Sequence, residues 1–448
     1  MATHGTARID VELDLRHEPG PAPPGRAQEI AEVLPGPVMF ATMFATAGPA
    51  GEAPAPQETW ALTGAWSHHG HVATGTAAVH YGAGHDRLVR PLIIADGFGY
   101  GPSDLRGLWR RLDTPYPPHG RRLLGELLAQ GFDVVLLGFA ARHTHLQANA
   151  GVAVACVRRA IAGRHGHAPL VAGGLCAGGL IMRYALADME QRGEDHQTGT
   201  YLSYDAPHNG AWIPLILQQL AHFAEHLAPA GPGQAALIRS PAAQQLLWAW
   251  VPSARYSGPV ATAGPLRAEF LRDLRRAGWF PNRPRKIGVA NGAADGTGRN
   301  VPPDEQVFAW DALDGLAGAT VRTQPARGPR RHVGGMRALP LWATRSYTSD
   351  VAAFDGAPGG TLPVYGGVAD LLGAPMDARF RSACFVPSVS AVALQFDPVE
   401  WPVDLYTDIT SLSPEQSELD DYQCDAHNSE HGQVTATLAE WILDQLGK

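Results

Sequence analysis

The sequence predicts an α/β protein with a mostly parallel central sheet, a β-rich N-terminal extension and a helical lid. From residue 91 onward, short apolar runs alternate with longer helical stretches, which is typical of a parallel sheet with crossover helices. Residues 8–15 alternate apolar and charged side chains, the period of a half-buried strand. We therefore divide the chain into an extension (1–90), a first core half (91–225), a lid (226–284) and a second core half (285–448).

Each element of the first core half has its own signal. Buried strands are predicted from continuous apolar runs, and helices from leucine or alanine spacing that ends near glycine. The expected strands are 91–99, 132–139, 168–174 and 199–205, and the expected helices are 121–131, 146–163 and 180–193. In the second half, we expect strands at 285–292 and 382–394 and a closing helix at 433–446.

Residues 212–284 are rich in leucine, alanine and tryptophan and lack strand alternation. Apolar helices placed between strands of such a sheet are either crossovers within the core or a lid over the site, and we favour the lid.

Charge and cysteine content restrict the class of function. With 35 basic and 43 acidic residues, the net charge of −8 argues against nucleic acid as the main partner. We see neither a signal peptide nor an apolar run of membrane-spanning length, so we expect no membrane partner. The four cysteines are scattered without CxxC pairs, which indicates a reducing cytoplasm. No cluster has metal-ligand spacing, so we expect neither a metal nor a cofactor.

The stretch "GGLCAGG" (173–179) has the pattern of a nucleophile elbow, a sharp turn between a strand and a helix. Gly174 and Gly178 stand two residues either side of Cys176, where a strained backbone leaves no room for a Cβ atom. An apolar strand precedes the turn and a helix follows it. The alternative interpretation is a buried structural cysteine in a glycine-rich turn.

The segment "GGLCAGGLIMRYALADME", with "PLIIADGFG" and "GFDVVLLGF" before it and "TGTYLSYDAPHNGAWIPL" after it, resembles the α/β-hydrolase superfamily, in particular its lipase-like esterases. The resemblance covers residues 91–220 well and the rest loosely. Serine usually stands at the elbow, so Cys176 departs from the pattern. Members with cysteine there are polyhydroxyalkanoate synthases, some assembly-line thioesterases and tetramate-forming Dieckmann cyclases. The resemblance therefore implies acyl transfer or cyclisation from a thioester.

Thioester chemistry gives a physical reason for a cysteine nucleophile at this turn. A thiolate that takes an acyl group from a thioester forms another thioester, so the step is close to energy-neutral. The bound acyl group stays electrophilic, and exclusion of water favours transfer or ring closure over hydrolysis.

The catalytic base is expected at His431, just before the last helix, where the fold places its histidine on a loop. His427, four residues earlier, is the alternative. His208 is expected to be structural and to bond the turn after its strand.

For the orienting acid, Asp205 ends the strand next to the nucleophile strand, as in the assembly-line thioesterases that this region resembles. Asp295 follows the next strand, where most hydrolases of the superfamily carry their acid. We favour Asp205, although either residue could be a turn-capping aspartate.

Two further features concern the substrate. The backbone N–H groups of Phe98 and Ala177 are predicted to form the oxyanion hole. The basic loop with Arg327, Arg330 and Arg331 is either a solvated loop or a docking site for a carrier protein.

The first interpretation of function is a cysteine-nucleophile acyltransferase or cyclase. It releases a polyketide or peptide thioester, carried on the phosphopantetheine of a carrier protein, by intramolecular Dieckmann-type cyclisation. A thioesterase or esterase that hydrolyses the same acyl-enzyme is the alternative. A non-catalytic binding protein and a polymer synthase are weaker alternatives.

Overall fold

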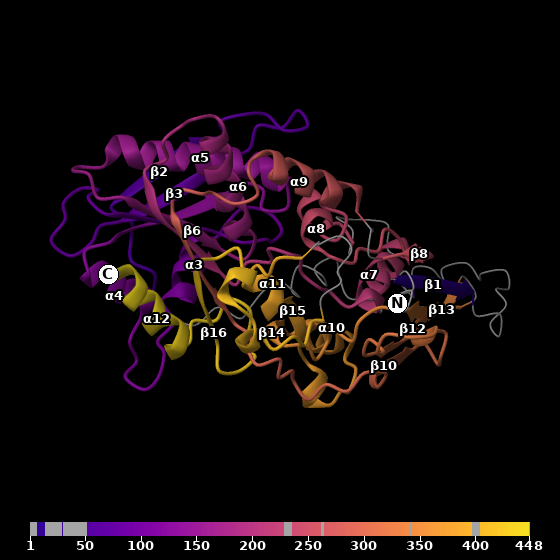
Figure 1. Cartoon of the computed structure of the whole chain (residues 1–448). Coiled ribbons are helices and arrows are strands. Elements are labelled where there is room, and N and C mark those ends of the chain that lie inside the picture. The colour runs from indigo at the N-terminus through magenta and orange to yellow at the C-terminus, as the bar shows by residue number, and fades with distance from the viewer. Residues whose placement is uncertain are drawn as a thin grey trace.

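The structure is a computed structural model, and it describes residues 7–13, 29, 52–227, 235–260, 264–339, 342–396 and 404–447. It confirms the α/β class, because a large sheet carries helices on both of its faces (Figure 1). Within the described residues, no helix is long and apolar enough to cross a lipid bilayer.

The central sheet has eight strands in the order β16-β9-β7-β6-β4-β5-β3-β2. Parallel pairings join β16 through to β5, and antiparallel pairings add β3 and β2 at one edge. The bounds are β2 (Glu58–Thr63), β3 (Thr74–His80), β4 (Pro91–Ala95), β5 (Asp133–Phe139), β6 (Leu170–Leu175), β7 (Thr198–Tyr204), β9 (Arg285–Ala290) and β16 (Asp421–Cys424). The apolar runs at 91–99, 132–139, 168–174, 199–205 and 285–292 are thus strands, as predicted.

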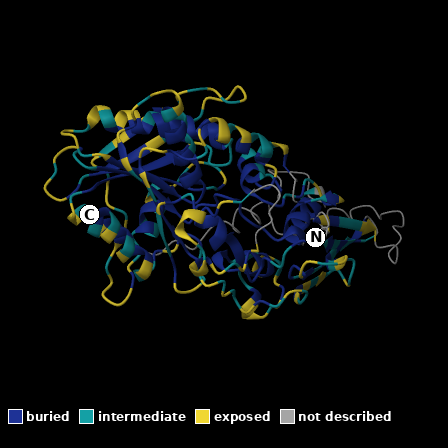
Figure 2. Cartoon of the chain, viewed as in Figure 1, coloured by how far each residue is buried: buried dark blue, intermediate teal, exposed yellow. Residues whose placement is uncertain are grey.

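Helices pack on the two faces of this sheet, with α5 and α6 on one face and α3, α4 and α12 on the other (Figure 1). Their bounds are α3 (Leu105–Leu112), α4 (Leu123–Ala129), α5 (Leu146–Gly163), α6 (Ala177–Gln191) and α12 (Ala436–Gly447). The leucine and alanine spacing predicted four of these helices, and α3 was not predicted. Buried side chains concentrate in the sheet and on the helix faces against it (Figure 2).

A second sheet of six antiparallel strands has the order β10-β11-β12-β13-β1-β8. The bounds are β1 (Arg8–Leu13), β8 (Gly258–Pro259), β10 (Gln306–Ala312), β11 (Ala317–Arg322), β12 (Arg331–Ala338) and β13 (Trp342–Ser349). The strand predicted at 8–15 is β1, but its partners lie far along the chain, at residues 258–259 and 344–349. The second sheet lies at the end of the molecule away from the C-terminus (Figure 1).

Smaller elements connect the two sheets. The strand expected at 382–394 is split into β15 and α11, and β15 pairs with β14 outside the central sheet. The bounds are β14 (Gly359–Leu362), β15 (Ala383–Pro387), α7 (Leu215–Leu227), α8 (Pro241–Leu246), α9 (Pro265–Arg276), α10 (Val364–Leu372), α11 (Ser388–Ala391) and three short 3₁₀ helices at Ala378–Phe380, Ile409–Ser411 and Pro414–Gln416.

The predicted segmentation cuts across these sheets. Residues 1–90 contribute β1 to the second sheet and β2 and β3 to the central sheet. Residues 285–448 contribute β9, β16 and α12 to the core and four strands to the second sheet. The segment predicted as a lid, 226–284, contains α8, β8 and α9.

Candidate active site

Cys176 stands at the turn between β6 and α6, with φ 54° and ψ −127°, a strained backbone for a residue with a side chain. Its backbone N–H donates to the carbonyl of Tyr204 at 2.9 Å, which ties the turn to the neighbouring strand. The side chain therefore stands at the end of the sheet and at the start of a helix, as the elbow pattern predicts.

The two glycines of the elbow are required by close backbone contacts. A Cβ atom on Gly178 would lie 2.2 Å from the carbonyl oxygen of Ala95, and one on Gly174 would lie 2.4 Å from the carbonyl carbon of Gly178. Both obstacles are backbone atoms, so no side-chain rotation can relieve them. The turn can therefore form only with glycine at both positions.

His431 and Asp205 lie together, although 226 residues separate them in the sequence. Asp205 follows β7 with φ 46°, and its Oδ2 accepts a hydrogen bond from Nδ1 of His431 at 2.7 Å. His431 also hydrogen-bonds the side chain of Cys176. The structure therefore brings the predicted nucleophile, base and acid into one connected array.

Asn291 holds the acid and the base in place, and the sequence interpretation did not identify it. Its backbone N–H donates to Oδ1 of Asp205 at 3.1 Å, and its Oδ1 accepts from the N–H of Gly432 at 2.9 Å. The backbone N–H of His431 donates to the carbonyl of Thr361 at 2.8 Å. These bonds fix the loop before α12 against the ends of β7 and β9.

The charge environment favours a protonated His431. Burial alone would lower the pKa of this imidazole, but the negative charge of Cys176 and the bonds to Asp205 and Cys176 outweigh burial and raise the pKa to about 10. The direction of this shift favours a charged ring beside the cysteine sulfur.

The alternative residues lie elsewhere. His427 is exposed, and Asp295 is exposed and accepts the N–H of Thr297 at 2.9 Å, so it caps a turn. His208 is buried, and its Nε2 lies 2.8 Å from Oγ of Ser203, which agrees with the expected structural position beside its strand.

The sulfur of Cys176 opens into a cavity of about 50 Å³. Asp96, Gly97, Phe98, Arg111, Arg142, Leu175, Leu362 and Phe385 line this cavity together with Cys176 and His431. Phe98 lines the cavity, and Ala177 follows the nucleophile as the first residue of α6. An oxyanion hole formed by their backbone N–H groups stays a prediction. None of these lining residues comes from 226–284, so a lid formed by that segment stays a prediction.

Two arginines at this cavity were not identified from the sequence. Arg142 lies 3.5 Å from Oδ2 of the buried Asp96. Arg111, on α3, is partly buried; burial lowers the pKa of its guanidinium, while the charges of Asp96, Cys176 and Glu430 act in the opposite direction. Two arginines, one of them paired with Asp96, therefore line the cavity that contains Cys176.

The other three cysteines are buried thiols. Burial raises the pKa of Cys156 and Cys424 to about 12 and that of Cys384 well above the usual range, so all three stay neutral at physiological pH.

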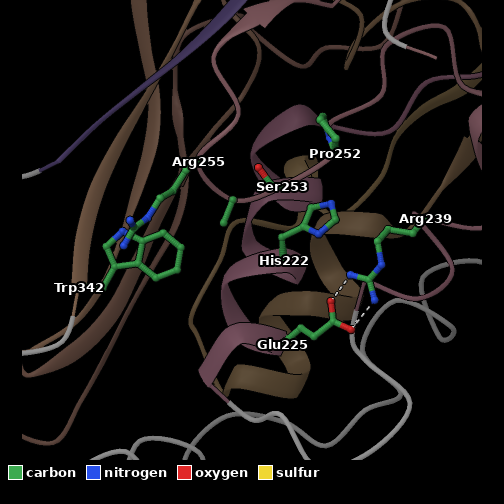
Figure 3. A pocket seen from close by; sticks show the side chains of 8 residues that line it. His222, Glu225, Arg239, Pro252, Ser253, Arg255 and Trp342 are labelled. Carbon is green, nitrogen blue, oxygen red and sulfur yellow. Dashed lines mark hydrogen bonds and ion pairs between the residues drawn. The ribbon is translucent and has the colours of Figure 1, made fainter. Parts of the chain in front are cut away.

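A larger cavity, of about 570 Å³, lies between α7 and the second sheet (Figure 3). Three of its polar side chains have partners: Glu225 forms an ion pair with Arg239, and Nε2 of His222 lies 2.8 Å from the backbone carbonyl of Val251. Arg255 stacks on Trp342 at 4.4 Å. The small cavity holds the nucleophile, and the large one does not.

The basic loop is engaged within the chain. Arg330 forms an ion pair with Glu12 and lies over the ring of Tyr347, and Arg331 forms an ion pair with Asp304. Neither these two residues nor Arg327 lines the Cys176 cavity. Docking of a carrier protein at this loop therefore stays a prediction.

No protein-family model matches the chain, and no curated protein matches it. Among solved structures, it is similar to a hyperthermophilic esterase from the archaeon Pyrobaculum calidifontis, with 12% identity, 60% of this chain and 80% of that chain covered, and a TM-score of 0.29. It is also similar to Est1E from Butyrivibrio proteoclasticus (14% identity, 36% of this chain and 54% of that chain, TM-score 0.23). A third is an α/β serine hydrolase without lid from Xanthomonas campestris (20% identity, 35% and 65%, TM-score 0.24). These similarities are too weak to support a conclusion about activity. Such a conclusion has to come from the geometry of the site.

Proposed function

We propose that the chain is an α/β-hydrolase-fold enzyme in which Cys176 takes an acyl group from a thioester and releases it by intramolecular, Dieckmann-type cyclisation. The observation that carries the proposal is the connected array of Cys176, His431 and Asp205 at a small, enclosed cavity. A serine elbow with a neutral histidine serves ester hydrolysis, whereas a cysteine beside an imidazolium serves reversible acyl exchange.

Acyl transfer begins from a thiolate and an imidazolium. A histidinium beside a cysteine stabilises the thiolate, and Asp205 holds the ring through Nδ1 so that its other nitrogen faces the sulfur. The thiolate attacks the thioester carbonyl and forms a new C–S bond to Cys176, and the C–S bond to the departing carrier thiol breaks. The departing thiolate takes the proton of His431, which leaves an acyl-cysteine and a neutral imidazole.

Ring closure uses that neutral imidazole as a base. In a β-ketoacyl substrate, the carbon between two carbonyl groups gives its proton to His431, and the resulting enolate attacks the acyl-cysteine carbonyl. The bond to the sulfur breaks, so the thiolate and the imidazolium are both restored. Arg111 and Arg142 support this step, because cations at the cavity stabilise a negatively charged enolate.

The donor in this proposal is a thioester on the phosphopantetheine arm of a carrier protein. A slender arm suits a narrow cavity, and the chemistry of the first step requires a thiol leaving group. We place the reaction in a reducing compartment, where the four free thiols persist.

Hydrolysis of the same acyl-enzyme is the second candidate. A cavity of about 50 Å³ has room for a water molecule, whose share of liquid volume is about 30 Å³. A water beside His431 would release the free acid instead of a ring.

The proposal is tested with a β-ketoacyl-aminoacyl thioester, offered both on a small thiol and on a carrier protein, with products followed by mass. Cyclisation gives a product one water lighter than the free acid, absent with Cys176→Ala and present with the matched variant Asp295→Asn. Free acid alone would make the enzyme a thioesterase. A lack of turnover of both thioesters would overturn the proposed acyl transfer.

A further inference from the structure

A cluster of histidines lies outside the candidate active site, where three segments of the chain meet. His68 and His69 belong to the turn between β2 and β3, His145 directly precedes α5, and Glu269 lies on α9. We propose that these four residues form a binding site for a divalent transition-metal ion, with Zn²⁺ favoured by the donor set.

The candidate ligand atoms form two groups that share His68: His68, His69 and His145 form one, and His68, Glu269 and Asp273 form the other. One ring nitrogen from each of the three histidines lies within 4.8 Å of the others. Oε1 of Glu269 lies 2.6 Å from Nε2 of His69 and 3.8 Å from Nε2 of His68. Three imidazoles and one carboxylate are a set that Zn²⁺ binds in tetrahedral sites.

Two of these nitrogens lack partners. Within the described part of the chain, Nε2 of His68 and Nδ1 of His145 are shielded from solvent and form no hydrogen bond. A shielded polar atom without a partner costs free energy, and a metal ion would supply the missing interaction for both atoms at once.

The ring nitrogens of the three histidines lie within 4.8 Å of one another, so binding one ion requires only a small rearrangement. Bonds of 2.0–2.1 Å at tetrahedral angles put ligand atoms roughly 3.4 Å apart. The rings therefore need to move inward by about 1 Å, and the exposed His69 would exchange its 2.6 Å hydrogen bond to Oε1 of Glu269 for coordination.

Asp273 belongs to the second candidate ligand group, with His68 and Glu269. It also approaches His68, but its Oδ2 already accepts from Nε2 of Gln147 at 3.0 Å, and its Oδ1 accepts from Arg276 at 3.2 Å. It is therefore placed to orient the cluster through α9.

The site would tie α9, which lies in the segment predicted as a lid, to the β2–β3 turn and to the start of α5. His145 is three residues after Arg142, which lines the Cys176 cavity, so the ion would also stiffen one wall of that cavity. A structural role therefore fits better than a catalytic one, since no cluster residue lines the cavity.

The test uses the full chain after dialysis against a chelator, in a Cys176→Ala background so that the nucleophile cannot bind metal. Zn²⁺ is titrated by calorimetry and thermal unfolding, and Co²⁺ is titrated by its visible absorption. We expect one ion per chain, a tetrahedral Co²⁺ spectrum without thiolate charge transfer, and a rise in melting temperature with Zn²⁺ concentration.

The ligand variants are His145→Gln and Glu269→Gln, and the matched control is His71→Gln, an exposed histidine of the same turn. We expect both ligand variants to weaken Zn²⁺ binding by at least about tenfold and the control to bind like the parent. Equal binding by parent, ligand variants and control would overturn the proposal, and so would a parent that binds no stoichiometric ion. The outcome is independent of the proposed acyl transfer, because no step of the assay requires turnover.

Discussion

Replacing Asp205 by asparagine tests whether this carboxylate sets the charge and tautomer of His431. The carboxylate accepts two hydrogen bonds, one from Nδ1 of His431 at 2.7 Å and one from the N–H of Asn291 at 3.1 Å. An amide can satisfy only one of them. If its oxygen stays on Asn291, its NH₂ group faces His431 and demands an unprotonated Nδ1. The remaining proton then lies on the nitrogen that faces Cys176, where it blocks proton acceptance from the thiol.

The expected loss of acyl-transfer rate follows from the hydrogen bond between Asp205 and His431 that the variant lacks. A hydrogen bond to a charged group contributes about 1.5–3 kcal/mol, and each 1.36 kcal/mol corresponds to about a factor of ten. Loss of the correct tautomer adds to this cost, so we expect acyl transfer to fall between about 10²- and 10⁴-fold. Alkylation of Cys176 by iodoacetamide at pH 7 should fall in the same direction.

The assay measures second-order alkylation rates at pH 7 and pH 9, with the modified residue located by mass. In the wild type, the raised pKa of His431 favours an imidazolium beside the sulfur, so the rate at pH 7 should exceed that of Asp205→Asn. In Asp205→Asn the rate should be low at pH 7 and recover partly at pH 9. Asp295→Asn, at an exposed turn, is the matched control and should behave like the wild type. A folded Asp205→Asn variant that reacts at the wild-type rate at pH 7 would refute this reasoning.

Three further perturbations test the elbow, the cavity and a buried carboxyl. Gly178→Ala should destabilise the chain by about 3 kcal/mol or more. Its control, Gly367→Ala, has open space at the Cβ position and should leave the melting temperature unchanged or raise it. Equal effects of the two substitutions on the melting temperature would contradict the elbow geometry. Arg111→Met should slow ring closure by at least about tenfold and slow acylation of Cys176 less, and single-turnover kinetics separate the two steps. An equal loss of rate in both steps would contradict a role of Arg111 in stabilising the enolate. Burial raises the pKa of Asp355 to about 6, so the native state keeps a proton that the unfolded chain has lost above about pH 4. The protonated carboxyl therefore stabilises the fold fully below about pH 4, and this contribution is lost as the pH rises through 6. The free energy of unfolding of Asp355→Asn should rise by roughly 2–3 kcal/mol relative to wild type between pH 4 and 7. Denaturant unfolding that shows no such difference would contradict the shift.

The elements of the central sheet could be predicted because their signals are local. A strand such as β5 is apolar along its whole length, and the elbow has its strand, glycines and helix within about twenty residues. The array of Cys176, Asp205 and His431 was also within reach, because Cys176 and Asp205 directly follow predicted strands and His431 lies on the loop before the predicted last helix. The choice between His431 and His427, and between Asp205 and Asp295, needed the fold, since burial separates them.

The features that were missed depend on contacts far apart in the sequence. In the second sheet β1 pairs with β13, more than 300 residues away, and β12 contains two glycines that weaken its strand pattern. Arg111 lies on an arginine-rich helix, "LRGLWRRL", in which only packing decides which arginine faces the cavity. In the proposed metal site, His69 contacts Glu269, which lies 200 residues later in the sequence, so no local ligand spacing could reveal the site.

The most direct test of the central claim is intact-protein mass spectrometry of the wild type and of Cys176→Ala after a short exposure to the β-ketoacyl-aminoacyl thioester. The proposed mechanism predicts an acyl adduct on the wild type that maps to Cys176, decays as the cyclised product appears and is absent from Cys176→Ala. An adduct that forms equally on Cys176→Ala, or cyclised product that accumulates without Cys176, would contradict it.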